Sequence, residues 1–308
     1  MANFGLYIRM QHDWEDILED ALKADALRFN SLWINDHLIG FDEEHKDPYL
    51  EAWTLMTALA MKTSLRVGHT VLCNSFRAPS LLAKMASTLD VISNGRLELA
   101  LGTGWFEQEY KAYGYPFPSA GERVAQFREA LQIIKRLFTE EKVDFQGDYW
   151  TLEGAINNPK PVQKPHPPLW VGGEKPKVIA IAAEFADGLN IPHRTLDGAH
   201  QILEKLTNAC DRVGRKITDI RRSWFGGVRL AQTQEEARQL AKPLVKEKES
   251  LEYVLEKRMV GTAEDIIQKL GAYIDELGID QFMLAIRAAE SIQKPVELFS
   301  DEVISEFY

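Results

Sequence analysis

The stretch that decides the fold runs from residue 65 to residue 102, LRVGHTVLCNSFRAPSLLAKMASTLDVISNGRLELALG. It opens with a short apolar run over 65–72 and closes with another over 97–102, and we predict both to be strands. Residues 79–92 between them are typical of a helix, with Pro79 in its first turn. Apolar strands joined by a helix indicate parallel pairing, because crossover helices cover both faces of such a sheet.

The same alternation continues in both directions along the chain. Six further strands are predicted at 4–8, 31–35, 169–172, 188–191, 223–231 and 281–286. Further helices are predicted at 13–29, 48–62, 123–138, 177–185, 196–213, 233–248, 262–277 and 295–307. Eight strand–helix units in one chain predict an α/β protein, a single (β/α)8 TIM barrel over residues 1–308. A doubly wound open sheet is the alternative, but no G-x-G-x-x-G follows the first strand.

Two stretches are longer than a barrel unit needs, at about 103–122 and 142–176, and we predict both to be insertions. The second contains a candidate hairpin, VDFQGDYWTLEG, with Gly147 at its turn. Six of the thirteen prolines then lie between Pro159 and Pro176, a density that indicates an extended, rigid segment.

Composition limits the classes of partner. The 308 residues include 36 basic and 46 acidic side chains, a net charge of −10, which disfavours nucleic acid and anionic membranes as partners. Cys73 and Cys210 are too few for a disulfide scaffold. The first residues form no signal peptide, and no apolar run approaches the ~20 residues that cross a bilayer. We expect a cytoplasmic protein without a membrane-spanning segment.

Candidate functional residues follow the predicted strands, since barrels place their working side chains at the carboxyl ends. His37, after Asp36, can exchange a proton or pair with an anionic ring, although a histidine held by backbone at a strand end is the alternative. Thr103 lies between two glycines that would let a flat ligand approach, with Trp105 as an apolar plane beside it. A tight turn would explain the same glycines.

A second pair of glycines, Gly172 and Gly173, precedes a predicted helix and Lys175. Backbone N–H groups at a helix start form an anion site, and a simple Gly-Gly turn is the alternative. No nucleophile motif is present, and no metal site is expected because the remaining histidines lack ligand spacing. These are His12, His45, His69, His166, His193 and His200.

A long ordered set of motifs carries a resemblance to a known family. It includes SLWINDHL (31–38), STLDVISNGRLELALGTGWFEQEYKAYGYPFPSAGERVAQFREALQIIKRLFTEE (87–141), NPKPVQKPHPPLWVGG (158–173) and GTAEDIIQKLGAYIDELGIDQFML (261–284). The chain resembles the bacterial-luciferase-like flavin and deazaflavin monooxygenases, and within them the coenzyme F420-dependent oxidoreductases. The resemblance implies a (β/α)8 barrel with an insertion segment and a flavin-type ring at its carboxyl end.

The resemblance also implies roles for individual residues. His37 would face the reactive part of the ring, next to Asp36, and Thr70 and Val71 would form a non-prolyl cis peptide against the centre of the ring. The other implied cofactor contacts are Thr103, Gly104, Gln108, Gly172 and Gly173, the last two as backbone donors to the cofactor phosphate. The same relatives imply a small-molecule substrate, a homodimer, and a separate F420 or flavin reductase that supplies reduced cofactor.

Some positions depart from the family pattern. Trp105, which we expect among the catalytic residues, stands where the sugar-phosphate dehydrogenase branch has a glutamate. Residues 191–194 likewise replace that branch's phosphate clamp. Trp105 and Phe106, with Trp14 and Phe76 as further candidates, would give the site an aromatic mouth. These aromatic residues, and the loss of the phosphate clamp, favour a smaller or less charged substrate. The predicted function is an F420-dependent oxidoreductase; an FMN-dependent monooxygenase and a non-catalytic flavin-binding relative are the alternatives. An F420 enzyme would need basic side chains at the mouth for the cofactor's anionic tail, and the candidates are Arg77, Lys175 and Arg194.

Overall fold

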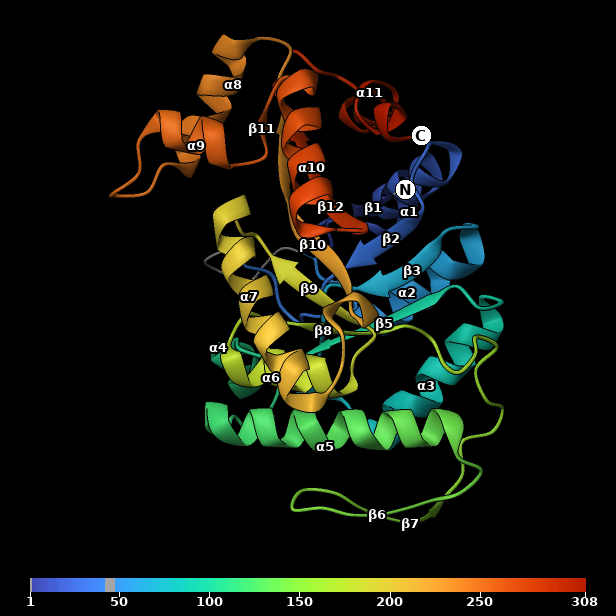
Figure 1. Cartoon of the computed structure of the whole chain (residues 1–308). Coiled ribbons are helices and arrows are strands. Elements are labelled where there is room, and N and C mark those ends of the chain that lie inside the picture. The colour runs from blue at the N-terminus through green and yellow to red at the C-terminus, as the bar shows by residue number, and fades with distance from the viewer. Residues whose placement is uncertain (1, 42–47) are drawn as a thin grey trace.

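Eight parallel strands close into a barrel surrounded by helices (Figure 1), as the alternation of apolar runs predicts. The computed structural model describes residues 2–41 and 48–308. Closure comes from pairing of the last barrel strand with the first, with Leu284 opposite Leu6. In order around the barrel the strands are β1 (Asn3–Tyr7), β2 (Ser31–Ile34), β3 (Arg66–His69), β5 (Leu97–Gly102), β8 (Leu169–Gly172), β9 (Gly188–Pro192), β10 (Arg221–Leu230) and β12 (Gln281–Ala288).

The helices bury one apolar face each against this barrel. In α7, for example, Ile202, Leu206 and Ala209 are buried at spacings of three and four. The helices are α1 (Trp14–Ala26), α2 (Ala52–Lys62), α3 (Pro79–Ile92), α4 (Glu107–Ala112), α5 (Ala120–Thr139), α6 (Pro176–Phe185), α7 (Leu196–Val213), α8 (Gln234–Ala241), α9 (Leu251–Lys257), α10 (Ala263–Leu277) and α11 (Pro295–Glu302). Within the described ranges, none of them combines the length and apolar character needed to cross a bilayer.

Two tryptophans fill the inside of the barrel. Trp33 and Trp170 are fully buried in one cluster with Ala100 and Met283. Trp33 needs a glycine on the neighbouring strand, because a Cβ atom on Gly68 would lie 2.4 Å from its ring. The barrel interior is therefore packed with side chains and is not a channel, so a ligand can enter only at its ends.

Two predicted helices are shorter in the structure for reasons that it shows. The helix expected over 48–62 begins at Ala52, because the Glu51 carboxylate caps it by accepting the N–H groups of Trp53 and Thr54. The helix expected over 233–248 ends at Ala241, where Pro243 follows in a 3₁₀ turn and cannot continue the α-helical hydrogen bonds.

The segment after Pro243 contains two elements that the sequence pattern did not predict. They are α9, which Ser250 caps, and β11 (Val260–Gly261), which pairs with β10. Here Val254 and Val260 are buried with Ala241 in a small apolar cluster apart from the main core. Figure 1 shows α8 and α9 standing off one side of the barrel.

The strand expected over 65–72 is interrupted. It divides into β3 and β4 (Leu72–Cys73), joined through a cis peptide bond between Thr70 and Val71. Both parts pair with β5, but the register shifts by one residue between them. One extra residue is thus accommodated at 70–71, at the carboxyl end of the strand.

The two long connections carry their own structure. Residues 103–122 hold α4, and residues 142–176 hold an antiparallel hairpin of β6 (Val143–Gln146) and β7 (Thr151–Ala155), as the sequence predicts. The hairpin extends beyond α5, at the bottom of Figure 1. The proline-rich stretch that follows contains cis bonds before Pro159 and Pro165.

A buried histidine gives the fold a pH dependence. His69 is fully buried, stacks on Trp53 with ring centroids 5.4 Å apart, and contacts the Ala52 carbonyl through Nε2 at 3.3 Å. Burial lowers the pKa of His69 to about 4. Below its unfolded value near 6.5 the unfolded chain binds a proton that the folded chain does not, so stability is lost as pH falls from about 6.5 to about 4.

We expect this single group to contribute about 2 to 3 kcal/mol to that loss. Urea unfolding of wild type and His69→Gln at pH 7 and pH 4.5 measures it, and the variant should lose less stability between the two conditions. His200→Gln, at an exposed position, is the control. Equal pH dependence of wild type and His69→Gln would contradict the assignment.

Candidate active site

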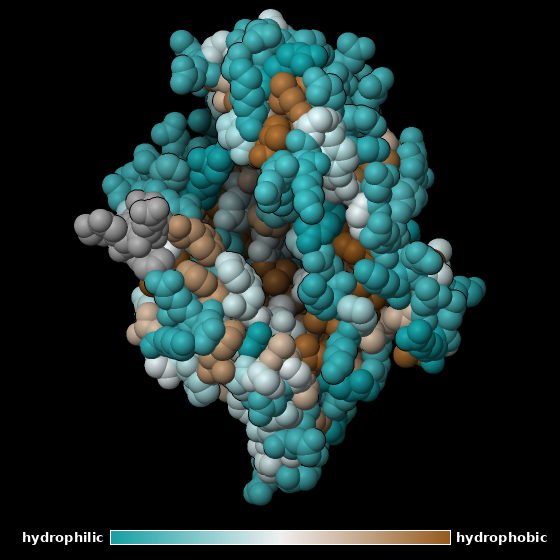
Figure 2. Space-filling model, turned by 90° about the vertical axis from the view of Figure 1, so that its left-hand side faces the viewer, coloured by the Kyte–Doolittle hydropathy of each residue, from teal (hydrophilic) through white to brown (hydrophobic). Residues whose placement is uncertain are grey.

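A hollow lies at the carboxyl end of the barrel, where β2, β4 and β5 end. Six of the residues singled out from the sequence line it, namely Asp36, His37, Thr70, Val71, Gly104 and Trp105. Figure 2, which turns the left side of Figure 1 toward the viewer, shows a depression with apolar residues at its depth and a largely hydrophilic rim. Thr103 and Gln108 lie close by in sequence but do not line the hollow.

Val71 connects three strands at the base of this hollow. A Cβ atom on Gly102 would lie 2.7 Å from Val71 Cγ2, and one on Gly172 would lie 2.7 Å from Val71 Cγ1. Val71 therefore packs between glycines of β5 and β8, and no larger residue fits at either position without displacement. This contact brings Thr70, Val71 and Gly172 together, although a hundred residues of sequence separate them.

Thr70 presents an unusual polar group in the hollow. Its Oγ1 is buried and has no hydrogen-bond partner among the described residues. Buried hydroxyls are normally paired, and leaving one unpaired costs free energy. A ligand with a polar edge next to Thr70 would satisfy it.

His37 is held by a carboxylate that the sequence interpretation missed. Its Nδ1 lies 3.1 Å from Oε2 of Glu109, whose side chain is 2% exposed. Glu109 also accepts the backbone N–H groups of Leu38 and Ile39. Because these backbone groups are donors, we assign the Nδ1 proton as a third donor to the same carboxylate, which leaves Nε2 of His37 for a ligand.

Asp36 anchors the loop that carries His37. Its carboxylate receives two bonds from the Arg77 guanidinium, at 2.7 and 3.0 Å, and the Cys73 N–H at 2.8 Å. Arg77 also pairs with Glu51 at 2.6 Å. Although burial disfavours a charged guanidinium, these two carboxylates raise the pKa of Arg77 above its ordinary value. Arg77 is therefore engaged by two carboxylates and only 9% exposed, so of the three basic candidates for the cofactor's anionic tail it is not available at the mouth.

Aromatic rings cover one side of His37. Trp105 is 65% exposed, stacks on Phe41 and Phe106, and meets the His37 ring edge-on at 5.9 Å. The other two aromatic candidates lie elsewhere. Phe76 is buried against Tyr110 and Tyr115, and Trp14 lies over Leu50 and Leu55 on a different face.

Cys73 belongs to the packing of this region. Its Sγ lies 3.0 Å from the Tyr110 hydroxyl, and burial raises the pKa of the Cys73 thiol to about 12. Gly104, at φ 74°, lets the Tyr110 ring approach, since a Cβ atom there would collide with its hydroxyl. A thiol held in its neutral form does not act as a nucleophile, which agrees with the lack of a nucleophile motif. Cys210 is fully buried in the core, as expected.

The paired glycines occupy the turn between β8 and α6. Gly173 has φ 146° and donates its N–H to the Asn190 carbonyl over a long 3.4 Å. Lys175 is exposed at the N-cap of α6, and Arg194 pairs with Glu174 at 2.6 Å. The turn thus places basic side chains beside the start of a helix.

Sequence reasoning singled out part of the lining of the hollow and missed other residues that line it, among them Glu109 and Tyr110. Glu109 follows directly after the 102–108 stretch singled out, and its position on α4 carries no motif. Nothing in the sequence links Arg77 to Asp36. Within residues 2–41 and 48–308, no group of three or more His, Cys, Asp or Glu side chains is arranged to hold a metal ion. His45 lies outside the described residues.

Comparison with known proteins adds to this geometry. The chain is 32% identical over 176 residues to an F420-dependent glucose-6-phosphate dehydrogenase of Amycolatopsis mediterranei (strain U-32). The aligned region covers 56% of this chain and 52% of that protein. It is 30% identical over 149 residues to an FMNH(2)-dependent dimethylsulfone monooxygenase of Pseudomonas putida, 48% of this chain and 39% of that one. The chain thus spans about half of the first of these relatives and less than half of the second.

The fold has a counterpart along its whole length. An F420-dependent secondary alcohol dehydrogenase in complex with an F420-acetone adduct superposes with a TM-score of 0.84 at 22% identity, over 99% of this chain and 98% of that one. The model of the luciferase-like monooxygenase family matches residues 2–283, which include all eight barrel strands up to Met283 in β12. The matched residues include the interrupted third strand and the glycine turn. The chain therefore belongs to the luciferase-like monooxygenase family.

Proposed function

We propose that the protein is an oxidoreductase that binds the deazaflavin coenzyme F420 at the carboxyl end of the barrel and exchanges hydride with a small organic substrate. The observation that carries the proposal is the Thr70 hydroxyl, which is buried and has no hydrogen-bond partner among the described residues, next to Val71 where it packs on glycines of β5 and β8. A flat ring with a polar edge fits such a site. Relatives that use F420 support this choice of ring.

Different residues of the chain would contact different parts of the cofactor. Thr70, Val71 and Gly104 line the hollow that would receive it, and Trp105 with Phe106 gives an apolar wall. Gly172 and Gly173 would meet the cofactor phosphate through their backbone, near Lys175. Thr103 and Gln108 remain predicted contacts along the ring and its side chain. A bound deazaflavin supplies a ring carbon that gives or takes a hydride.

His37 would accept or donate the proton that accompanies hydride transfer. A hydride that leaves an alcohol carbon must be matched by a proton that leaves the oxygen, and the reverse holds for reduction of a carbonyl. With Nδ1 held by Glu109, the Nε2 atom of His37 can accept or return that proton.

In the alternative function, FMN would bind in the same hollow in place of F420. Its support is the relative that uses reduced FMN, and in that case reduced flavin would come from a separate reductase. Fluorescence titration of the purified protein with F420 and with FMN separates the two. We expect saturable binding of F420 that is tighter than that of FMN. The reverse order would establish the monooxygenase alternative.

The second alternative is a non-catalytic flavin-binding protein. Binding of F420 without hydride transfer to or from alcohols, aldehydes or enones would support it.

Thr70→Val tests the observation that carries the proposal. The change removes a hydroxyl that has no partner within residues 2–41 and 48–308, so we expect no loss in melting temperature and roughly 3- to 10-fold weaker F420 binding. Thr207→Val, where the hydroxyl donates to the Leu203 carbonyl in α7, is the matched control and should leave F420 binding unchanged. Unchanged affinity in Thr70→Val would mean that the ring does not reach this hydroxyl.

Glu109→Gln tests the positioning of His37. The amide still contacts the loop but carries no charge, so we expect kcat to fall about tenfold, with KM and the melting temperature little changed. Glu107→Gln on the same helix, where Glu107 forms an exposed pair with Lys111, is the control. A loss of kcat that is matched by a loss of melting temperature would assign Glu109 a purely structural role.

A further inference from the structure

Tyr7 points into the barrel at its carboxyl end. It is the last residue of β1, a strand whose side chains alternate between the two faces of the sheet. Phe4 and Leu6 belong to the main core, whereas a Cβ atom on Gly5 would lie 2.4 Å from Nε1 of Trp33, inside the barrel. Tyr7 therefore faces inward as Gly5 does, and it packs on the internal cluster that contains Trp33.

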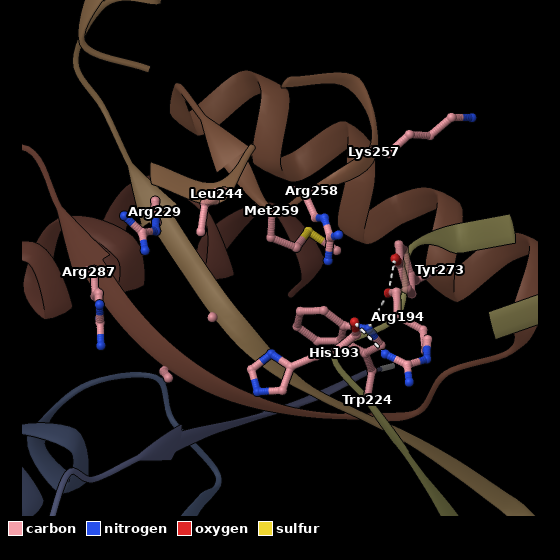
Figure 3. Close-up of a pocket in the computed structure, with 12 residues that line it drawn as sticks. His193, Arg194, Trp224, Arg229, Leu244, Lys257, Arg258, Met259, Tyr273 and Arg287 are labelled. Atoms are coloured by element: carbon pink, nitrogen blue, oxygen red, sulfur yellow. Dashed lines mark hydrogen bonds between the residues drawn. The ribbon is translucent and has the colours of Figure 1, made fainter. Parts of the chain in front are cut away.

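Tyr7 shares its level in the barrel with Val71 and Phe225. Both are partly buried and pack on the same internal cluster, and the Tyr7 and Phe225 rings lie 5.2 Å apart. On its other side Phe225 meets the ring of His193 edge-on at 4.7 Å, and Figure 3 shows this ring turned away from Arg194. Side chains inside a barrel stack in layers, so Tyr7, Val71 and Phe225 form the layer on which a ligand at the mouth would rest.

The order of the strands places Tyr7 beside the residues proposed to act. β1 pairs with β2, which leads to His37, and β2 pairs on its other side with β3, which leads to Thr70 and Val71. Tyr7 also lines a cavity of about 510 Å³ at the ends of β1 and β12. It thus lies between the hollow proposed for the ring and a second space that could receive a substrate.

The Tyr7 hydroxyl is available as a donor. In the part of the chain that the structure describes, no hydrogen bond to this hydroxyl is found. Burial raises the pKa of Tyr7 to about 12, and the charge of Arg9 offsets this only in part, so the hydroxyl keeps its proton at neutral pH. Tyr49 differs, because its hydroxyl already donates to Oδ1 of Asn35 at 2.6 Å.

We propose that the Tyr7 hydroxyl donates a hydrogen bond to the substrate oxygen whose proton His37 exchanges, which makes Tyr7 a second catalytic residue. The assignment rests on the proposed function. When an alcohol is oxidised, its C–H bond breaks and a hydride passes to the cofactor, while the O–H proton passes to Nε2 of His37 and a C=O bond forms. Tyr7 keeps its own proton. Negative charge develops on the oxygen in the transition state, so the hydrogen bond from Tyr7 is strongest there.

Tyr7→Phe tests this assignment, because the change keeps the ring contact with Phe225 and removes only the hydroxyl. We expect kcat for hydride transfer with the best alcohol or aldehyde to fall about 10- to 100-fold, while the Kd for F420 and the melting temperature change little. Tyr308→Phe is the matched control, since the Tyr308 hydroxyl donates to Asn30 on the exposed surface. An unchanged kcat in Tyr7→Phe, or a loss matched by weaker F420 binding or a lower melting temperature, would overturn the proposal.

A second measurement needs no turnover. Isotope-labelled cyclohexanone is the probe, and infrared spectroscopy follows its carbonyl band on the free protein and on the protein saturated with F420. A donated hydrogen bond lowers the carbonyl stretching frequency, so we expect the bound band to lie lower in wild type than in Tyr7→Phe. Equal frequencies, or no bound band in wild type, would overturn the proposal. If wild type transfers no hydride with any alcohol, aldehyde or enone, the proposed function fails, while the infrared comparison still decides whether Tyr7 donates to a carbonyl oxygen.

Discussion

Replacing His37 with alanine is expected to lower kcat by about 100- to 10,000-fold, while the Kd for F420 changes by less than about threefold. The reason is geometric. The imidazole lines the hollow and is held by Glu109 through Nδ1, so its removal deletes the group that exchanges the proton but few contacts to a flat ring. Stopped-flow measurement of hydride transfer and fluorescence titration of F420 give the two numbers independently.

The control for this variant is another His–Glu pair. His200 lies 3.1 Å from Glu276, but the pair is exposed and on the outer helices α7 and α10. His200→Ala should therefore leave both kcat and F420 affinity as in wild type. Loss of cofactor affinity equal to the loss of kcat in His37→Ala would show that His37 binds the ring and has no catalytic role.

Replacing Asp36 with alanine is expected to lower the free energy of unfolding by about 3 to 5 kcal/mol. The change removes one partner of a buried ion pair, leaving the Arg77 guanidinium and the Cys73 N–H without their acceptor. Glu51 alone then faces Arg77, and Glu51 is itself half exposed. Urea unfolding at pH 7 followed by circular dichroism measures the loss.

A double-variant cycle isolates the pair. Asp36→Leu combined with Arg77→Leu should be less destabilised than the sum of the single variants, because no buried charge is left unpaired. Asp197→Ala is the control, since its pair with Lys257 is exposed and should contribute less than about 1 kcal/mol. Additive losses in the cycle would mean that Asp36 and Arg77 do not depend on each other.

The barrel could be predicted from the sequence because its determinant is local. Each buried strand is a short apolar run and each helix has its own periodicity, so the eight units are visible one at a time. The errors have local causes that the pattern does not encode. Glu51 begins α2 through a side-chain cap, and the extra residue at 70–71 divides a run that the apolar pattern shows as continuous.

The site could be predicted only in part. The rule that working residues follow strand ends singled out His37 and Gly104, and the family resemblance added Thr70; the structure places all three around one hollow. The contacts that position them join distant parts of the chain, such as His37 with Glu109 and Asp36 with Arg77. Pairing of this kind depends on tertiary geometry, which explains why Arg77 was a candidate for the cofactor's anionic tail and is a buried partner of Asp36.

The most direct test of the central claim is a crystal structure of the protein grown with F420. The account predicts electron density for a planar tricyclic ring in the hollow lined by His37, Thr70 and Val71, with the cofactor phosphate at Gly172 and Gly173. A well-ordered structure in which this hollow contains no ring, or in which the cofactor lies elsewhere on the molecule, would contradict it.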